Sequence, residues 1–171
     1  MNKKYFLTIF HPLYFFGTGF GSGFSPLAPG TIGSLISIPF WLLMHWLLSF
    51  WWCCFFIVFC FLIGILICQK ISDDMKVYDH SSIVWDEFVG MWLTLMSIYN
   101  INLVWVLIAF MIFRFFDILK PWPIIWFHKK ILGGFGIMFD DVIAAFFSVI
   151  ILLILQYFVL FFSVYFDRLF I

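Results

Sequence analysis

Residues 34–68 read SLISIPFWLLMHWLLSFWWCCFFIVFCFLIGILIC and contain no Asp, Glu, Lys or Arg. About 20 apolar residues form a helix that crosses the roughly 30 Å hydrocarbon core of a bilayer. The stretch is too long for one such helix and just long enough for two. Ser49 marks the turn between them, and Trp46, Trp51 and Trp52 lie beside it, as aromatic anchors do at a membrane surface.

The rest of the chain has the same apolar character. Of its 171 residues, 65% are hydrophobic and 11% are charged, against roughly 45–50% and about 25% in a soluble domain. The excess apolar surface must face lipid. The formal net charge is zero, so nothing indicates a nucleic-acid partner.

Two further charge-free runs extend the pattern. Residues 88–113 are interrupted by the polar loop Tyr99-Asn-Ile-Asn102, and residues 142–166 could span alone. The first 23 residues begin like a signal peptide, but His11-Pro12 interrupts the apolar stretch, and we expect them to be retained. The predicted fold is all-α: one membrane domain over residues 1–171, with about four to five membrane-embedded helices and a glycine-rich N-terminal loop. The candidate spans are 34–49, 51–69, 83–98, 103–119 and 142–165.

These spans place most charges on one membrane face. Eight of the nine cations lie on or near the face formed by 1–33, 70–82 and 120–141, and only Arg168 lies across. The positive-inside rule identifies that face as cytoplasmic. The eight are Lys3, Lys4, Lys70, Lys76, Arg114, Lys120, Lys129 and Lys130.

The glycine-rich segment 17–34 also belongs to this face. Alternating glycines allow backbone N–H groups to converge on an anion, and a following helix N-terminus favours negative charge. The candidate phosphate-binding residues are Gly19, Gly21, Gly23, Ser25 and Thr31. A flexible re-entrant loop is the alternative interpretation.

Five carboxylates stand at three predicted helix ends on the same face. They are Asp86, Glu87, Asp117, Asp140 and Asp141. Each has a structural explanation: helix-dipole stabilisation for the first two, an i,i+3 pair between Arg114 and Asp117, and a helix cap for the last two.

Together, however, the carboxylates would repel one another, and a hard divalent cation such as Mg²⁺ removes that cost. Arg114 and Lys120 can bind phosphate oxygens, and His80 is a candidate proton donor or orienting residue. Metal-assisted phosphoryl transfer is the chemistry that this set favours.

At these residues the sequence resembles the phosphatidylglycerophosphatase A family of bacterial inner-membrane enzymes. The matching stretches are GFGSGFSPLAPGTIGSL (19–35), DHSSIVWDEFVGMW (79–92), FRFFDILKPWPI (113–124) and GGFGIMFDDVIA (133–144). The resemblance implies Mg²⁺-dependent hydrolysis of phosphatidylglycerophosphate to phosphatidylglycerol at the cytoplasmic face of the inner membrane.

Other functions stay open at this point. The motifs do not set the lipid, so a broader lipid-phosphate phosphatase is the first alternative. A small cation transporter and a structural assembly protein are the others. We expect direct attack on phosphorus by metal-activated water, and an aspartyl phospho-enzyme is the alternative. The residues do not indicate an oligomeric state.

Overall fold

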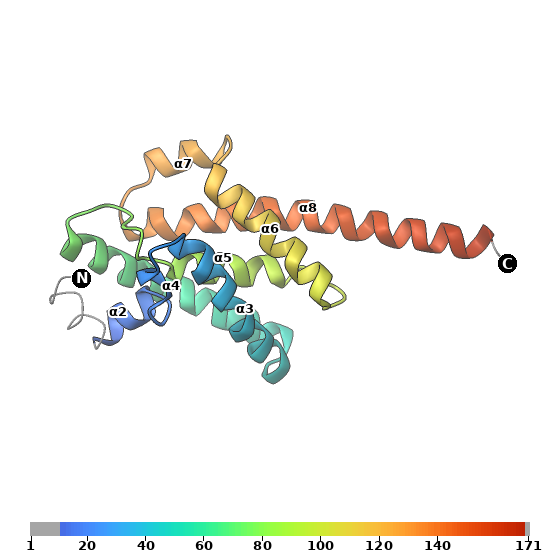
Figure 1. Ribbon diagram of the computed structural model, residues 1–171, viewed down its shortest axis with the longest axis horizontal. Helices are drawn as coiled ribbons and strands as arrows, with labels where there is room; N and C mark the ends of the chain where they lie inside the picture. Colours follow the sequence, from blue (N-terminus) through green and yellow to red (C-terminus); the bar gives the residue numbers. More distant parts are fainter. Residues whose placement is uncertain (1–10, 170–171) are drawn as a thin grey trace.

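The fold is known from a computed structural model, which describes residues 11–169. Every regular element among these residues is helical, as predicted. Figure 1 shows their arrangement. In chain order they are α2 (Pro12–Gly17), the short 3-10 helix η1 (Ser22–Phe24), α3 (Pro29–Leu47), α4 (Phe50–Met75), α5 (Trp85–Leu95), α6 (Leu103–Leu119), α7 (Ile124–Lys130) and α8 (Gly133–Leu169).

Three helices are long and apolar enough to cross a membrane: α3, α4 and the part of α8 from Gly133 to Ser163. The predicted spans 34–49 and 51–69 correspond to α3 and α4. Helix α6 matches the predicted span 103–119 residue for residue and, with 17 residues, is at the lower limit of about 17–25 for a crossing helix. Helix α8, with 37 residues, is the longest described helix and extends past the other helices in Figure 1.

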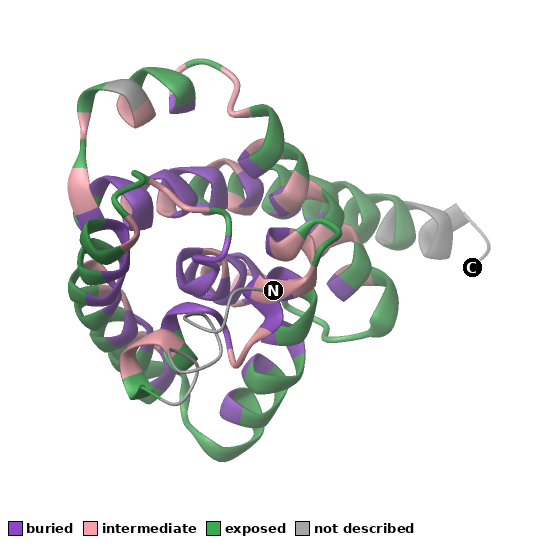
Figure 2. Cartoon of the chain, turned by 60° about the vertical axis from the view of Figure 1, so that its left-hand side comes forward, coloured by how far each residue is buried: buried purple, intermediate pink, exposed green. Residues whose placement is uncertain are grey.

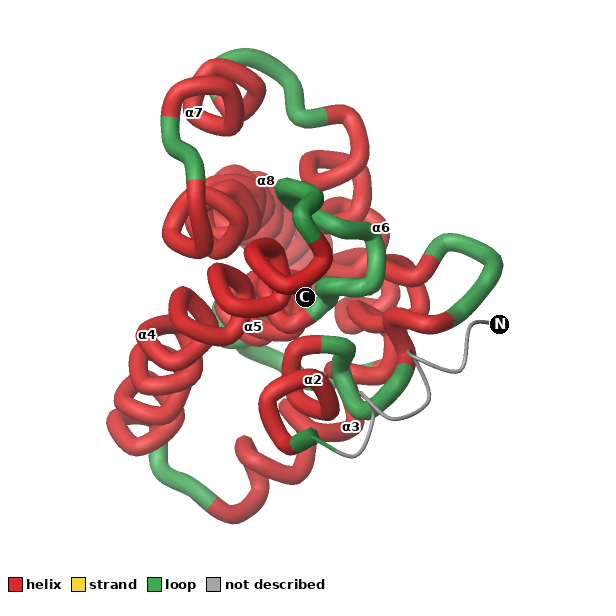
Figure 3. Tube along the Cα trace, turned by 90° about the vertical axis from the view of Figure 1, so that its left-hand side faces the viewer, coloured by secondary structure: helices red, strands yellow, loops and turns green. Residues whose placement is uncertain are grey.

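Helix α5 corrects the prediction of a span over 83–98. It has 11 residues, about 16 Å at the α-helical rise, which is half of the hydrocarbon core. It packs against α3, α4, α6 and α8, and Figure 3 shows it between them. Its apolar residues are therefore buried by protein, whereas exposed residues lie on the outward faces of the other helices, as Figure 2 shows.

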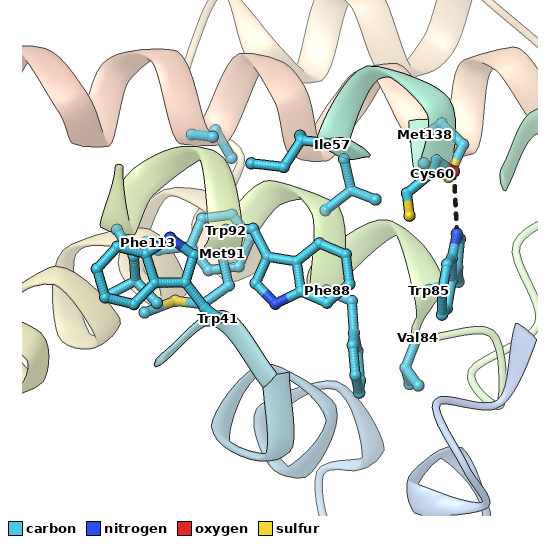
Figure 4. Packing of buried hydrophobic residues seen from close by; sticks show 14 of the residues in the cluster. Trp41, Ile57, Cys60, Val84, Trp85, Phe88, Met91, Trp92, Phe113 and Met138 are labelled. Atoms are coloured by element: carbon cyan, nitrogen blue, oxygen red, sulfur yellow. Dashed lines mark hydrogen bonds between the residues drawn. The ribbon is translucent and has the colours of Figure 1, made fainter. Parts of the chain in front are cut away.

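Aromatic side chains hold α5 in the bundle. Phe88 is completely buried, and the indole N–H groups of Trp85 and Trp92 donate hydrogen bonds to the carbonyls of Cys60 in α4 (3.1 Å) and Ser37 in α3 (2.9 Å). Figure 4 shows Trp85, Phe88 and Trp92 in this core. Hydrogen bonds between membrane helices contribute about 0.6 kcal/mol on average, so the packing fixes the position of α5 more than the two bonds do.

Long-range contacts bring five helix ends together. Arg114 near the end of α6 binds Glu87 at the start of α5, which lies against Gly30 at the start of α3. The Gly134 N–H at the start of α8 donates to Gln69 near the end of α4. We call this end of the bundle the site end. It carries the predicted charged face, although Lys3 and Lys4 lie outside the described residues.

Candidate active site

A polar pocket of about 420 Å³ opens at the site end. The predicted helix ends supply most of its charged side chains, which supports the expectation that they share one site. Its wall is formed by Ala28, Pro29, Gly30, Thr31, Asp79, Ser81, Ile83, Asp86, Glu87, Arg114, Asp117, Ile118, Lys120 and Asp141.

The first turn of α5 contributes Asp86 and Glu87, as predicted. Negative charge is favourable there because the N-terminus of a helix carries a partial positive charge. Helix α3 approaches Glu87 so closely that a Cβ at Gly30 would lie 1.8 Å from its Oε1 atom. Only glycine fits at position 30 without displacing this carboxylate.

Arg114 on α6 links three elements. Its Nη1 atom lies 2.5 Å from Asp117 Oδ2, which confirms the predicted i,i+3 pair, and 3.2 Å from Glu87 Oε1. The same atom donates to Ser34 Oγ in α3 at 3.2 Å. The guanidinium is therefore held in place, and its Nε atom is buried with no partner in the described chain.

Lys120 follows the last residue of α6 and lies on the pocket wall. Its Nζ atom is 3.2 Å from Asp140 Oδ2, which also pairs with His128. Burial lowers the pKa of Lys120, but the charges of Asp141 and Asp140, with other carboxylates, raise it above its ordinary value, so the side chain stays cationic. Asp140 itself does not line the pocket; it holds Lys120 from outside.

Three wall residues have left-handed backbone conformations without being glycine. They are Ala28 (φ 44°), Asp79 (φ 51°) and Lys120 (φ 40°). Such conformations are disfavoured for residues with a Cβ and collect at functional sites, where the surrounding structure imposes them. The backbone at this end of the bundle is shaped for the pocket.

The pocket holds more negative than positive charge. Its five carboxylates and two cations give a formal charge of −3 when all are ionised. Asp86 Oδ1, Glu87 Oε2 and Asp141 Oδ2 are buried and have no hydrogen-bond partner in the described chain. Buried carboxylate oxygens need a partner, and a cation is one that would also balance the charge.

The donor set fits Mg²⁺ in a particular way. Among the described residues, no three His, Cys, Asp or Glu side chains are grouped as a complete metal site. Mg²⁺ usually takes one or two carboxylates and completes its shell with water and substrate phosphate oxygens. Carboxylates spread over a pocket wall suit this mode, in which a phosphate shares the ion.

Comparison with known proteins identifies the family to which the chain belongs. A family model of phosphatidylglycerophosphatase A matches residues 15–156, which include the whole polar pocket. The chain belongs to the phosphatidylglycerophosphatase A family. Membership makes it a phosphatase, which decides against the cation transporter and the structural protein.

Individual relatives agree. The Phosphatidylglycerophosphatase A of Haemophilus influenzae is 46% identical over 154 residues, which cover 90% of this chain and 94% of the relative. That of Escherichia coli is 48% identical over 140 residues, covering 81% and 80%. A Bacteroides thetaiotaomicron protein described as "Putative phosphatidylinositol-3-phosphatase" is 38% identical over 147 residues, covering 82% and 91%. No solved structure matches the chain.

The glycine-rich segment lies beside the pocket. Of its five predicted phosphate-binding residues, Thr31 is on the pocket wall, whereas Gly19, Gly21, Gly23 and Ser25 are not. Ser25 instead donates to the Leu27 carbonyl, and the N-cap of α3 is Ala28, with no side-chain cap.

Two of these glycines, Gly19 and Gly23, are closely packed against the chain that precedes α5 and its first turn. A Cβ at Gly23 would lie 2.1 Å from the carbonyl oxygen of Ser82, and one at Gly19 would lie 2.7 Å from Phe88 and Val84. The segment therefore supports the chain that leads into Asp86 and Glu87.

Two further expectations differ from the structure. His80 does not line the pocket, and its Nδ1 atom lies 2.8 Å from Ser82 Oγ. Asp140 and Asp141 are not caps of α8, because the helix begins at Gly133, two turns earlier. Conversely, Asp79 and Ser81 line the pocket but were not among the predicted site residues. The only signal for Asp79 was its place beside His80 in the motif DHSS.

Proposed function

We propose that this chain hydrolyses phosphatidylglycerophosphate to phosphatidylglycerol and phosphate, with Mg²⁺, as a step of phospholipid synthesis. The observation that carries the proposal is the polar pocket, in which unpartnered carboxylate oxygens and two fixed cations lie at one end of an apolar bundle. The names of the Haemophilus and Escherichia relatives supply the substrate.

Mg²⁺ would be held by a subset of four carboxylates on the wall, namely Asp86, Glu87, Asp117 and Asp141. Bound there, the ion would polarise the phosphoryl group and lower the pKa of a coordinated water. Three of these carboxylates have an oxygen with no hydrogen-bond partner in the described chain, which supports Asp86, Glu87 and Asp141 as direct ligands of the Mg²⁺ ion.

The protein's own groups complete the reaction. Arg114 and Lys120 neutralise the non-bridging phosphate oxygens, which carry the charge of the transition state. Water attacks phosphorus and gives its proton to a carboxylate on the wall while the bond from phosphorus to the glycerol oxygen breaks. Asp79 lies on the pocket wall outside the membrane-spanning helices, and burial raises its pKa above that of an ordinary aspartate. It is therefore a wall residue suited to return a proton to the leaving alkoxide.

The membrane orientation completes the proposal. The relatives are bacterial, and the site end carries Lys70, Lys76, Arg114, Lys120 and Lys130. By the positive-inside rule this end faces the cytoplasm, so we place the protein in the inner membrane with the pocket on the cytoplasmic side.

Phosphate release from phosphatidylglycerophosphate by protein reconstituted in lipid tests the reaction. Wild type should be active with Mg²⁺ and inactive with a chelator. The Asp86→Asn variant should release phosphate at least about 100-fold more slowly, because a pocket carboxylate is removed. Asp73→Asn is the matched control, since Asp73 is exposed on α4 and its carboxylate accepts a hydrogen bond from Gln69, outside the polar pocket. A folded wild type that releases no phosphate would overturn the assignment.

A broader lipid phosphatase is the second candidate, and the Bacteroides relative favours it because its name specifies a different phospholipid. Turnover of phosphatidylglycerophosphate should be compared with that of phosphatidate, an isoprenoid phosphate and phosphatidylinositol 3-phosphate. Comparable kcat/KM values across the four lipids would support the broader activity.

A further inference from the structure

A second cavity lies next to the polar pocket, on the lipid side of α6. It has a volume of about 660 Å³ and is lined by Met111, Ile112, Arg114, Phe115, Phe116, Ile118, Leu119 and Ile151. Among the described residues that line it, Arg114 alone is charged. We call it the α6 groove.

The α6 groove and the polar pocket are continuous at two residues. Arg114 and Ile118 line both cavities. Met111, Arg114, Phe115 and Ile118 have the i, i+3, i+4, i+7 spacing of one helix face. The same face of α6 thus presents an apolar surface below Arg114 and a cation at the edge of the polar pocket.

The groove has the depth of one membrane leaflet. Ile151 lies ten residues after Asp141 on α8, about 15 Å at the α-helical rise, or half of a hydrocarbon core of roughly 30 Å. Met111 (65% exposed) and Ile118 (63% exposed) are open to the surroundings rather than covered by another helix. A molecule in the groove can therefore enter sideways from the bilayer.

We propose that the α6 groove holds an acyl chain of the lipid substrate while its phosphate occupies the polar pocket. This inference rests on the proposed function and extends it to the apolar part of the substrate. A chain in the groove gains little affinity, because lipid tails surround it in the bilayer anyway. Its effect is to orient the lipid so that the phosphate meets Arg114 and Lys120.

The test is the ratio of kcat/KM for a long-chain phosphatidylglycerophosphate to that for a dihexanoyl analogue, both in mixed micelles. Met111→Trp fills the groove, and the ratio should fall about tenfold because the bulky ring displaces the long chain. Leu62→Trp is the control: Leu62 is 56% exposed on α4 and lines neither cavity. Its ratio should equal that of wild type.

A second measurement does not need an active variant. A photoreactive group midway along an acyl chain of phosphatidylglycerophosphate should label the 111–119 segment more than the same group on phosphatidylcholine does. Met111→Trp should remove the difference.

Failure of the proposed function and failure of the acyl-chain groove would give different results. An inactive wild type would overturn the proposed function. An active wild type whose ratio is the same for Met111→Trp and Leu62→Trp, or equal labelling of α4 and α6 by both lipids, would overturn the acyl-chain groove alone.

Discussion

The neighbouring aspartates Asp140 and Asp141 have different surroundings. Asp141 lines the polar pocket and keeps an unpartnered oxygen, whereas Asp140 lies outside it, paired with Lys120 and His128. Residues adjacent in a helix point about 100° apart, so an adjacent acidic pair cannot present both side chains equally to one ion. Substitution of the two residues should therefore affect activity in different ways.

Asp141→Asn should raise the Mg²⁺ concentration for half-maximal activity at least about tenfold, because a metal-binding oxygen is lost. Asp140→Asn should leave that concentration unchanged and lower kcat by up to about 100-fold, because Lys120 loses the group that positions it. Mg²⁺ titrations of phosphate release measure both values. An equal rise in the Mg²⁺ requirement for both variants would make Asp140 a ligand as well.

Arg114 should not tolerate lysine. Its Nη1 atom already bonds Glu87, Asp117 and Ser34, and its Nε atom is buried, so we expect a phosphate to meet the Nη2 N–H groups of the planar guanidinium. An ammonium is a point charge and cannot do both. Arg114→Lys should lower kcat/KM about 100-fold, the cost typical of a lost transition-state donor.

Lys70→Arg is the control for this substitution. Lys70 is an exposed partner of Asp74 on α4, and exposed ion pairs contribute little. The Lys70→Arg variant should therefore keep wild-type activity. Wild-type kcat/KM in Arg114→Lys would show that positive charge alone is sufficient at position 114.

At the scale of elements, local signals explain which helix boundaries were predictable. Helix α6 begins after Asn102, whose side chain accepts the Trp105 N–H, and ends before Pro121. Both signals are in the local sequence. Helix α8 begins nine residues earlier than predicted, because Gln69 of α4 accepts the Gly134 N–H. A cap supplied by another helix leaves no local signal.

Helix α5 shows a second feature that the local sequence does not reveal. Hydropathy measures how apolar a segment is and not what surrounds it, so a short helix buried in protein resembles a membrane span. The carboxylate motifs were predictable because charge is conspicuous in an apolar chain. Asp79 was not, since only the folded loop places it on the pocket wall.

The glycine-rich segment allows a test between packing and phosphate binding. Gly23→Ala should lower activity strongly, because the new Cβ would lie 2.1 Å from the Ser82 carbonyl and displace the segment leading to Asp86. Gly21→Ala meets nothing within 4 Å, and its φ of 91° costs only backbone strain of about 1–2 kcal/mol. Activity should therefore be far closer to wild type at position 21. Equal losses at both positions would favour the phosphate-cradle interpretation.

At the scale of the whole molecule, the bundle separates its polar and apolar parts along the membrane normal. From Asp141 to Ser163, α8 covers about 33 Å at the α-helical rise, close to the thickness of the hydrocarbon core. Gln156, well along this length, accepts the Tyr99 N–H and ties the α5–α6 loop to α8. The loop therefore lies toward the membrane face opposite the pocket, where the alternation of predicted spans put it.

This arrangement predicts the labelling pattern of introduced cysteines. The starting protein should have Cys53, Cys54, Cys60 and Cys68 replaced by alanine and keep its activity, because all four are free thiols within α4.

In this background, Asn100→Cys and Ser49→Cys should react with a membrane-impermeant maleimide from outside the inner membrane. Lys76→Cys and Val77→Cys, which are exposed at the site end, should react only after the membrane is opened. The reason is that the positive-inside rule holds the cation-rich end in the cytoplasm. Labelling of Asn100→Cys from the cytoplasmic side would show that the protein has the opposite orientation in the membrane. The pocket would then face away from the cytoplasm, and its substrate would have to reach it from the outer leaflet.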